Sequence, residues 1–418
     1  MILILSFSSL LLSVILLQLS SGILGPLDVL SGYAIGFSTT QIGMLGSAHF
    51  IGFFAGCWIG PGLVGQIGHS RAFAVFAASG TVGILLHMVI INPYAWCFMR
   101  ILAGLCVAGC FTVMEGWIQA KTQNHNRGRS LRAYRTADMV GGIAAQSLIA
   151  LLPHGNYIAY NIIAIICCSS LLPLALTRIP APKTLPNLKF YPFLAYRTSV
   201  MATAGVITAG ITSAGFRMAG PIFGAQIELS DLQLGLFLGS FLVGGALAQY
   251  PIGWLADKFD RRRLLIVLSF FAIGACVFIL TLSNLNATFL MLGTVIFGFF
   301  TYPIYSVSAA HANDFIDPDK VVELNASLLF CFGIGAIFSP YFISILIELF
   351  GTLSMFAFIA LIHFVLVIFG IIREKIGQTP DRKTKYIFTP RTSWKIGGLL
   401  RKTRNQDRNN LDANQSHE

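Results

Sequence analysis

Four ionisable side chains lie inside long apolar stretches of this sequence: Arg100, Glu115, Asp138 and Arg217. An ionisable group within a membrane helix costs free energy unless it faces a water-filled cavity or a partner, so such groups mark solute, ion or proton pathways. We therefore expect these four residues to take part in substrate binding or proton coupling.

Arg100 and Glu115 share one apolar stretch. A helix rising about 1.5 Å per residue places them roughly 22 Å apart, too far for a direct ion pair, although both lie within about 60° of one face. Arg100 either serves substrate or proton coupling or holds its helix to neighbouring carbonyl groups. Glu115 either carries a proton or forms a gate pair with Arg71 or with the basic cluster Arg127–Arg135.

Asp138 and Arg217 each have a structural alternative. Asp138 follows a basic loop, so it could be an interfacial acid near a helix N-terminus, paired with Arg135 or Arg71. Arg217 is expected toward the outer end of its span. It could form an outer-gate ion pair with Asp28, or its side chain could extend to the outer surface.

Metal and cofactor chemistry has no support in the sequence. The eight cysteines fall in apolar stretches without the spacing of a zinc site or a disulfide framework. His49, His87 and His363 lie within spans, but no two have a ligand spacing, and we expect them to be packing residues. The sequence therefore predicts no metal and no cofactor.

The composition excludes a soluble protein, because 55% of the 418 residues are hydrophobic and only 11% are charged. At about 20 apolar residues per crossing, the apolar stretches predict twelve membrane-spanning helices. They lie near residues 2–25, 41–63, 73–92, 95–119, 136–152, 157–177, 199–222, 232–254, 264–282, 287–310, 323–348 and 354–373. The predicted fold class is an all-α membrane protein.

The distribution of Lys and Arg predicts the orientation. All of the 28 Lys and Arg residues except Arg100 and Arg217 fall in the loops after even-numbered spans or in the C-terminal tail. Basic residues are enriched in cytoplasmic loops, so both termini are predicted to be cytoplasmic. This asymmetry explains the net charge of +11 without nucleic acid as a partner. The basic tail, residues 376–418, is predicted to be disordered and close to anionic lipid headgroups.

An internal repeat divides the chain. The segment from Ser38 to Gly43, which opens the second span, is similar to the segment from Ser230 to Gly235, which opens the eighth span 192 residues later. The predicted organisation is an N-terminal six-helix bundle (1–177), a cytoplasmic linker (178–198), a C-terminal six-helix bundle (199–375) and the tail. Parallel repeats of this kind are typical of secondary transporters, which move one half against the other around a central site.

The segment from Gly253 to Arg263, GWLADKFDRRR, resembles the loop signature of the major facilitator superfamily. The first half has a partial copy, PGLVGQIGHSR from Pro61 to Arg71, in which Gly65 replaces the usual acid. Arg100 to Gly104 and Asn126 to Arg129 are similar to further patterns of that family. The degenerate first loop and the sequence MEGW from Met114 to Trp117 also resemble a bacterial subgroup, the YcaD-like transporters.

The resemblance implies a gate in the second half. Asp257 would cap and tether a neighbouring span, and Arg261 would bridge Asp257 to Asp314 and latch the outward-open state. It also implies a multi-pass protein of the bacterial inner membrane, which we expect to act as a monomer. The fifth span lacks the Gly-Pro pair carried there by the family's drug/proton antiporters, which lowers the weight of a drug-efflux function.

The leading hypothesis is a secondary active transporter that moves a small organic solute by alternating access, with a proton as the coupling ion. The two arginines within spans hint at an anionic solute. The alternatives are a drug or metabolite efflux antiporter and a transport-dead membrane regulator. A membrane enzyme would need paired catalytic groups, which the sequence does not offer, and a channel fits the six-plus-six repeat poorly.

Overall fold

The first half of the chain is a bundle of six membrane-spanning segments. The computed structural model describes residues 8–121, 127–176, 191–282, 286–317 and 320–376, and its elements there are helices. The first bundle contains α2 (Ser8–Ala34), α3 (Thr39–Ile67), α4 (His69–Leu86), α5 (Pro93–Lys121), α6 (Arg127–Leu148) continued by η2 (Ile149–Leu151), and α7 (Tyr157–Ser169) continued by α8 (Leu171–Ala175).

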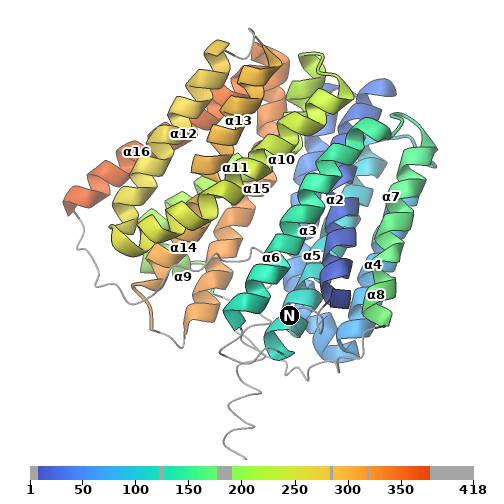
Figure 1. Cartoon of the computed structure of the whole chain (residues 1–418), viewed down its shortest axis with the longest axis horizontal. Helices are drawn as coiled ribbons and strands as arrows, with labels where there is room; N and C mark the ends of the chain where they lie inside the picture. Colours follow the sequence, from blue (N-terminus) through green and yellow to red (C-terminus); the bar gives the residue numbers. More distant parts are fainter. Residues whose placement is uncertain (1–7, 122–126, 177–190, 283–285, 318–319, 377–418) are drawn as a thin grey trace, which may run out of the picture.

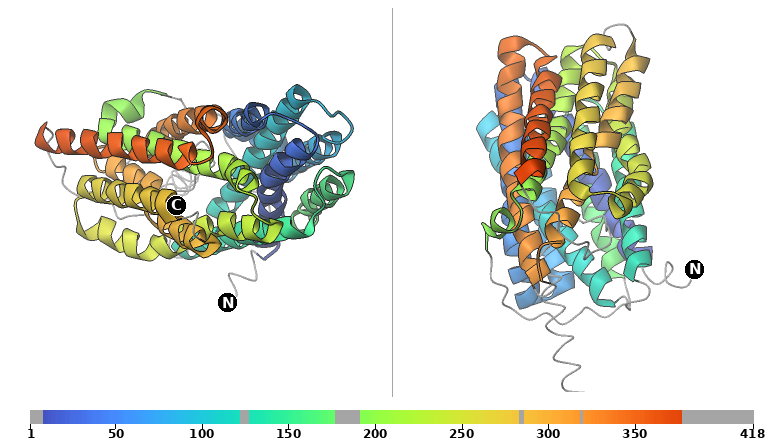
Figure 2. Two further views of the ribbon diagram at one scale, coloured as in Figure 1. Left: turned by 90° about the horizontal axis from the view of Figure 1, so that it is seen from above. Right: turned by 90° about the vertical axis from the view of Figure 1, so that its left-hand side faces the viewer.

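The second half repeats this arrangement after the short helix α9 (Leu194–Thr198). Its spans are α10 (Val200–Gln226), α11 (Asp231–Lys258), α12 (Arg261–Leu282), α13 (Ala287–Thr301) continued by α14 (Ile304–Asn313), α15 (Val321–Phe350) and α16 (Ser354–Ile376). The two bundles lie side by side (Figures 1 and 2). The predicted all-α fold with twelve spans in two six-helix bundles is confirmed. The proposed tail and much of the proposed linker lie outside the described residues.

Two helices extend beyond the apolar stretches that predicted them. α2 ends at Ala34, nine residues past the expected end, and α6 begins at Arg127, nine residues before the expected start. A helix is held by its own backbone hydrogen bonds, so it can continue where its side chains are no longer uniformly apolar. As a result, Asp28 lies inside α2 instead of closing the span.

The sequence repeat corresponds to a repeated helix start. The Ser38 side chain accepts from the backbone N–H of Gln41, and the Gln41 side chain accepts from the Ser38 N–H, which is a capping box at the start of α3. Ser230 and Gln233 form the same box at the start of α11. Each box satisfies two backbone donors that a helix N-terminus leaves free.

The helices pack closely where glycine removes the side chain. A Cβ atom at Gly104 of α5 would collide with the His49 carbonyl of α3, and one at Gly52 of α3 would collide with the Ile101 carbonyl. Gly244 and Gly298 make the equivalent approach between α11 and α13. Small residues are used in this way in membranes, where helix association depends on close contact.

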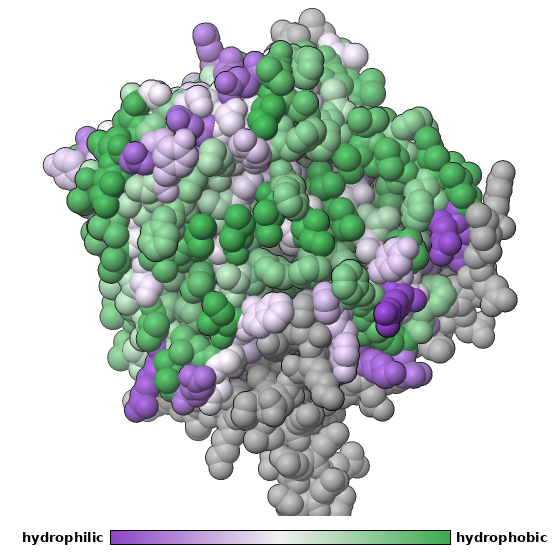
Figure 3. Space-filling view, turned by 180° about the vertical axis from the view of Figure 1, so that it is seen from behind, coloured by the Kyte–Doolittle hydropathy of each residue, from purple (hydrophilic) through white to green (hydrophobic). Residues whose placement is uncertain are grey.

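Ten helices of the described ranges are long and apolar enough to cross a membrane, and α6 and α10 complete the twelve spans. Side chains from both of these less apolar spans line the central cavity described below. The face seen in Figure 3 is largely apolar, and hydrophilic residues gather mainly toward its edges. We call the end of the molecule where α2 begins and α16 ends the termini end.

Candidate solute-binding and coupling site

A central cavity lies between the two halves. Its volume is about 1360 Å³, counting the part that is open to solvent. Helices α2, α3, α5 and α6 of the first half and α10, α11 and α15 of the second contribute to its wall. The polar and charged residues of the wall are Gln18, Ser21, His49, Tyr134, Arg135, Asp138, Gln146, Ser213, Arg217 and Tyr302. Both halves therefore supply groups that could bind one solute.

Contacts between the halves close the end of the molecule opposite the termini. Glu348 of α15 accepts hydrogen bonds from the backbone N–H of Thr40 on α3, at 3.0 Å, and from the Thr40 hydroxyl. Gln226 of α10 donates to the Tyr33 hydroxyl at 3.2 Å. From this end the two bundles diverge toward the termini end (Figure 1). This arrangement corresponds to a state in which the cavity is reached from the termini end.

Arg217 lies in the cavity and deeper in its span than the expected span end near residue 222 implied. α10 continues for nine residues beyond it, to Gln226, which places Arg217 within the span. Its side chain is exposed, and it lines the cavity. Among the described residues it has no hydrogen-bond or ion-pair partner. The cavity wall therefore carries an arginine whose donors are free to bind a ligand.

Asp28 pairs with Arg100, and the pair with Arg217 that was one of the two alternatives is not formed. Arg100 Nε lies 3.5 Å from Asp28 Oδ2. The Tyr160 hydroxyl donates to Asp28 Oδ1 at 2.9 Å. His87 Nε2 lies 3.5 Å from Oδ2. The four side chains are buried inside the first half and come from α2, α5, the end of α4 and α7.

His87 has a more specific place than the packing role expected for it. Its Nδ1 lies 2.8 Å from the Gly83 carbonyl, which fixes the ring so that Nε2 faces Asp28. The ring also stacks on Tyr160, with centroids 5.3 Å apart. The sequence by itself does not predict this contact, because the residues involved lie on different helices.

Arg100 also touches the second half. Its Nη2 donates to the Met218 sulfur at 3.5 Å. Met218 follows Arg217 on α10 and lines the cavity. A Cβ atom at Gly46 of α3 would collide with Met218, so this side chain is inserted against the first half. The buried Asp28 and Arg100 pair is therefore in contact with the helix that carries the cavity arginine.

Glu115 and Asp138 both pair with Arg135, one of the partners considered for each. Arg135 Nη2 lies 3.6 Å from Glu115 Oε1, and Arg135 Nη1 lies 3.5 Å from Asp138 Oδ2. The Tyr134 hydroxyl donates to Glu115 at 3.0 Å. Glu115 and Arg100 do not pair, as the helix geometry predicted. The group Glu115, Arg135 and Asp138 lies within the first half, on α5 and α6.

Arg71, the other partner considered for these acids, is exposed on α4. It has no ion pair with any residue whose side chain the structure describes. The side chains of Arg127, Arg129 and Arg132 are outside that description. The structure therefore gives no support to Arg71 as a gating residue in this state.

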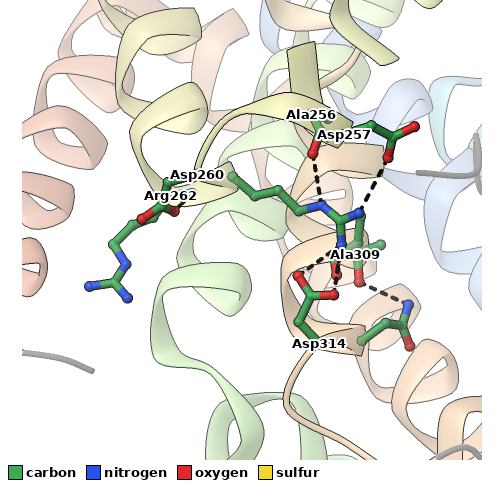
Figure 4. Close-up of polar contacts among 9 residues, drawn as sticks. Ala256, Asp257, Asp260, Arg262, Ala309 and Asp314 are labelled. Atoms are coloured by element: carbon green, nitrogen blue, oxygen red, sulfur yellow. Dashed lines mark hydrogen bonds and ion pairs between the residues drawn. The ribbon is translucent and has the colours of Figure 1, made fainter. Parts of the chain in front are cut away.

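Arg261 contacts both acids named by the family resemblance, although that resemblance assigned the bridge to the outward-open state and the cavity here is reached from the termini end (Figure 4). Its Nη1 lies 2.9 and 2.8 Å from the two carboxylate oxygens of Asp314, and its Nη2 lies 3.6 Å from Asp257. It also donates to the carbonyls of Ala256 and Ala310. Arg261 and Asp314 are buried, whereas the Asp257 side chain is 45% exposed. The three residues are in contact; their gating role stays a proposal.

The first half lacks this cluster. His69 takes the place of Arg261 in the repeat, and Gly65 takes the place of Asp257. His69 is buried, and its ring centroid is 5.8 Å from that of Trp117. Neither ring nitrogen has a hydrogen-bond partner in the part of the chain that the structure describes. The two halves are thus asymmetric at the termini end.

Two polar atoms of the cavity wall are buried without a hydrogen-bond partner among the described residues, Ser213 Oγ and His49 Nδ1. The sequence placed His49 within a span but expected only a packing role for it. Ser213 could have been noticed only from its spacing of one helical turn from Arg217. Within the described parts of the chain, no three His, Cys, Asp or Glu side chains could hold a metal ion.

The family model for the Major Facilitator Superfamily matches residues 201–404. The chain is 27% identical over 377 residues to the MFS-type transporter YcaD of Salmonella arizonae, covering 89% of this chain and 96% of that protein. The YcaD protein of Salmonella enteritidis is also 27% identical, with the same coverage. The expected resemblance to this superfamily and to YcaD is confirmed.

Solved structures resemble the whole helical part of the chain. The nucleoside transporter NupG aligns with a TM-score of 0.72 at 14% identity, covering 89% of this chain and 99% of NupG. A bacterial homolog of the lysosomal transporter Spinster, in an inward-facing and occupied conformation, aligns with a TM-score of 0.72 at 14% identity over 88% and 96% of the chains. The D-xylose-proton symporter aligns with a TM-score of 0.68 at 15% identity over 92% and 99%. These likenesses concern the fold.

Proposed function

We propose that this chain, which has the fold of the major facilitator superfamily and resembles YcaD-type transporters, moves a small organic solute across the membrane by alternating access. The observation that carries this proposal is the central cavity between the halves, lined by charged groups from both and closed by Glu348 and Thr40 at one end. Movement of one half against the other around such a site would expose it to each side in turn.

The solute is proposed to carry an anionic group. Arg217 lines the cavity without a carboxylate partner, and an arginine in this position favours an anion. The cavity arginine Arg135, by contrast, is already close to Glu115 and Asp138. Nothing in the described cavity requires a cofactor.

A proton is proposed as the coupling ion, with Asp28 and Arg100 as the coupling pair. Protonation of Asp28 would remove its attraction for Arg100, which lies 3.5 Å away and also contacts Met218 of the other half. Proton binding would therefore change a contact between the halves, which is the differential interaction that a conformational switch requires. Glu115, Arg135 and Asp138 are a second set of candidates.

The proposed location is the bacterial inner membrane, with both termini in the cytoplasm. The support is the concentration of Lys and Arg in loops at the termini end. With this orientation, the state described above is open to the cytoplasm. We expect a monomer, and we propose neither an enzymatic activity nor a nucleic-acid partner.

Reconstitution into proteoliposomes tests the proposal. A transporter that binds a labelled solute will exchange it in counterflow, and a proton-coupled one will also accumulate it under a pH gradient until an ionophore is added. Exchange of the solute without proton-dependent accumulation would contradict the proposed proton coupling. Net movement of the solute in the direction opposite to proton flow would indicate an efflux antiporter. Binding of the solute without exchange would indicate a transport-dead regulator.

A further inference from the structure

Ser213 and Arg217 form a pair of unused donors on one wall of the cavity. They lie four residues apart on α10, so their side chains are neighbours on one helix face. The Ser213 side chain is buried, at 8% exposed, and its hydroxyl has no hydrogen-bond partner within the described ranges. A buried hydroxyl without a partner costs free energy, so a ligand that bonds to it is favoured.

The charges around the cavity favour a single anionic group. Of the two arginines that line it, Arg135 lies within 3.6 Å of two carboxylates, whereas Arg217 makes no ion pair with a described carboxylate and is attracted by Asp138 only at longer range. A solute with a second carboxylate would bring that group close to Asp138, which lines the same cavity. The repulsion between like charges in a poorly solvated cavity disfavours a dicarboxylate.

The remaining wall is apolar and combines phenylalanines with aliphatic residues such as Val107 and Leu242. Phe50 and Phe53 of α3 face the cavity from the first half, and Phe241 of α11 and Phe332 of α15 face it from the second. Phe50 and Phe53 form an edge-to-face pair with ring centroids 6.5 Å apart. Such rings bind a flat apolar body by burial and by ring contacts.

We infer that the solute is a small aromatic monocarboxylate, whose carboxylate binds to Arg217 and Ser213 and whose ring lies among these phenylalanines. This inference rests on the proposed function and specifies the substrate class of the same cavity. The planar guanidinium can donate two parallel hydrogen bonds to a carboxylate, and the Ser213 hydroxyl can donate a third. A neutral solute such as a nucleoside would leave the Arg217 guanidinium without a carboxylate at hydrogen-bond distance.

The test is a thermal-shift titration of the purified full chain with benzoate, benzamide, phthalate and uridine. A ligand that binds the folded protein raises its melting temperature by mass action. Benzoate is expected to raise the melting temperature. Benzamide, which has the same shape but is neutral, is not expected to raise it, and neither are phthalate and uridine. Arg217→Gln is expected to weaken benzoate binding about 10- to 100-fold and Ser213→Ala about fivefold.

Two further variants control for folding. Arg217→Lys keeps the charge but loses the planar fork, so it should fold normally and bind benzoate more weakly than the wild type. Lys320→Gln removes an exposed cation outside the cavity and should bind benzoate like the wild type. Benzoate that fails to stabilise the wild type, or that stabilises Arg217→Gln and the wild type equally, overturns the inference.

Failure of this inference is distinguishable from failure of the proposed function. Counterflow exchange of a neutral or dicarboxylate solute in proteoliposomes, without benzoate binding, would overturn the inference and leave the transporter proposal standing. Benzoate binding at Arg217 without any exchange would support the site and contradict the transport function.

Discussion

Arg100 Nε lies 3.5 Å from Asp28 Oδ2 in the interior of the first half, and both side chains are at most 2% exposed. A charge that is buried in this way is tolerated because its partner is buried with it. Arg100 reaches the second half through Met218. This pair therefore connects the inside of one half to the interface that has to move.

Asp28→Asn tests proton coupling. The substitution keeps the shape of the side chain but removes the group that is proposed to take the proton. Accumulation driven by a pH gradient is expected to disappear, while counterflow exchange in the same proteoliposomes continues. Tyr160→Phe is the matched control, because it removes a hydrogen bond to Asp28 but keeps the carboxylate. Retained accumulation in Asp28→Asn would show that the proton is carried elsewhere.

The same substitution has an expected cost in stability. Asp28→Asn leaves Arg100 as a buried charge without its carboxylate, which destabilises by about 3–5 kcal/mol. The double variant with Arg100→Gln removes both charges and should recover part of this loss. Thermal unfolding of the two variants measures the difference, and an equal loss in both would argue against the pair as a buried ion pair.

Glu115→Gln is expected to raise the affinity for an anionic solute. It removes one negative charge beside Arg135, so the cavity becomes more favourable for an anion, and we expect a several-fold lower KM with unchanged gradient dependence. Transport kinetics at two ionic strengths measure this. Lost accumulation with retained counterflow would instead identify Glu115 as the proton carrier, and a solute leak would identify it as a gate residue.

Asp257→Asn is expected to shift the molecule toward the state described here. By family resemblance Asp257 tethers a neighbouring span in the opposite, outward-open state, and its side chain is half exposed in the present one. A cysteine at Ser21, in the cavity wall, should therefore be labelled faster from the termini side. Arg263→Gln, which disrupts an exposed pair with Glu374, is the control. Unchanged labelling in Asp257→Asn would rule out the tethering role.

Glu348→Gln should have the opposite effect. It weakens two hydrogen bonds that hold the halves together at the end opposite the termini. A loss of about 1 kcal/mol corresponds to roughly a fivefold shift toward the state open at that end. Labelling of the same cysteine from the opposite side reports the shift. Glu374→Gln alters a contact within one half and should leave the labelling rate unchanged. If it changed the labelling rate as much as Glu348→Gln does, Glu348 would not be a gate residue.

Reporter fusions test the orientation. Fusions placed after Lys189 and after Lys375 are both expected to give a cytoplasmic signal, because these positions lie among the basic segments. A periplasmic signal from either fusion would overturn the predicted topology and, with it, the assignment of the present state as open to the cytoplasm.

The sequence alone determined the architecture. Apolar stretches of membrane length predicted twelve spans, and the repeated Ser and Gln of the capping boxes marked equivalent helices in the two halves. These features are local: hydropathy, helix capping and the loop signature are each contained in a short segment of chain. The charges at Arg100, Glu115, Asp138 and Arg217 were also recognisable as unusual from the sequence.

Only the tertiary structure decided which of these charges meet. A pair between Asp28 and Arg217 was one of two alternatives, but α2 extends past its apolar stretch and takes Asp28 into the span, and Arg217 lies nine residues before the end of α10. Asp28 then meets Arg100, and Arg217 faces the cavity. The contacts made by His87, Ser213 and Met218 depend on how separate helices pack. Side-chain spacing along one helix cannot specify such contacts, because rotation and depth of each helix are set by its neighbours.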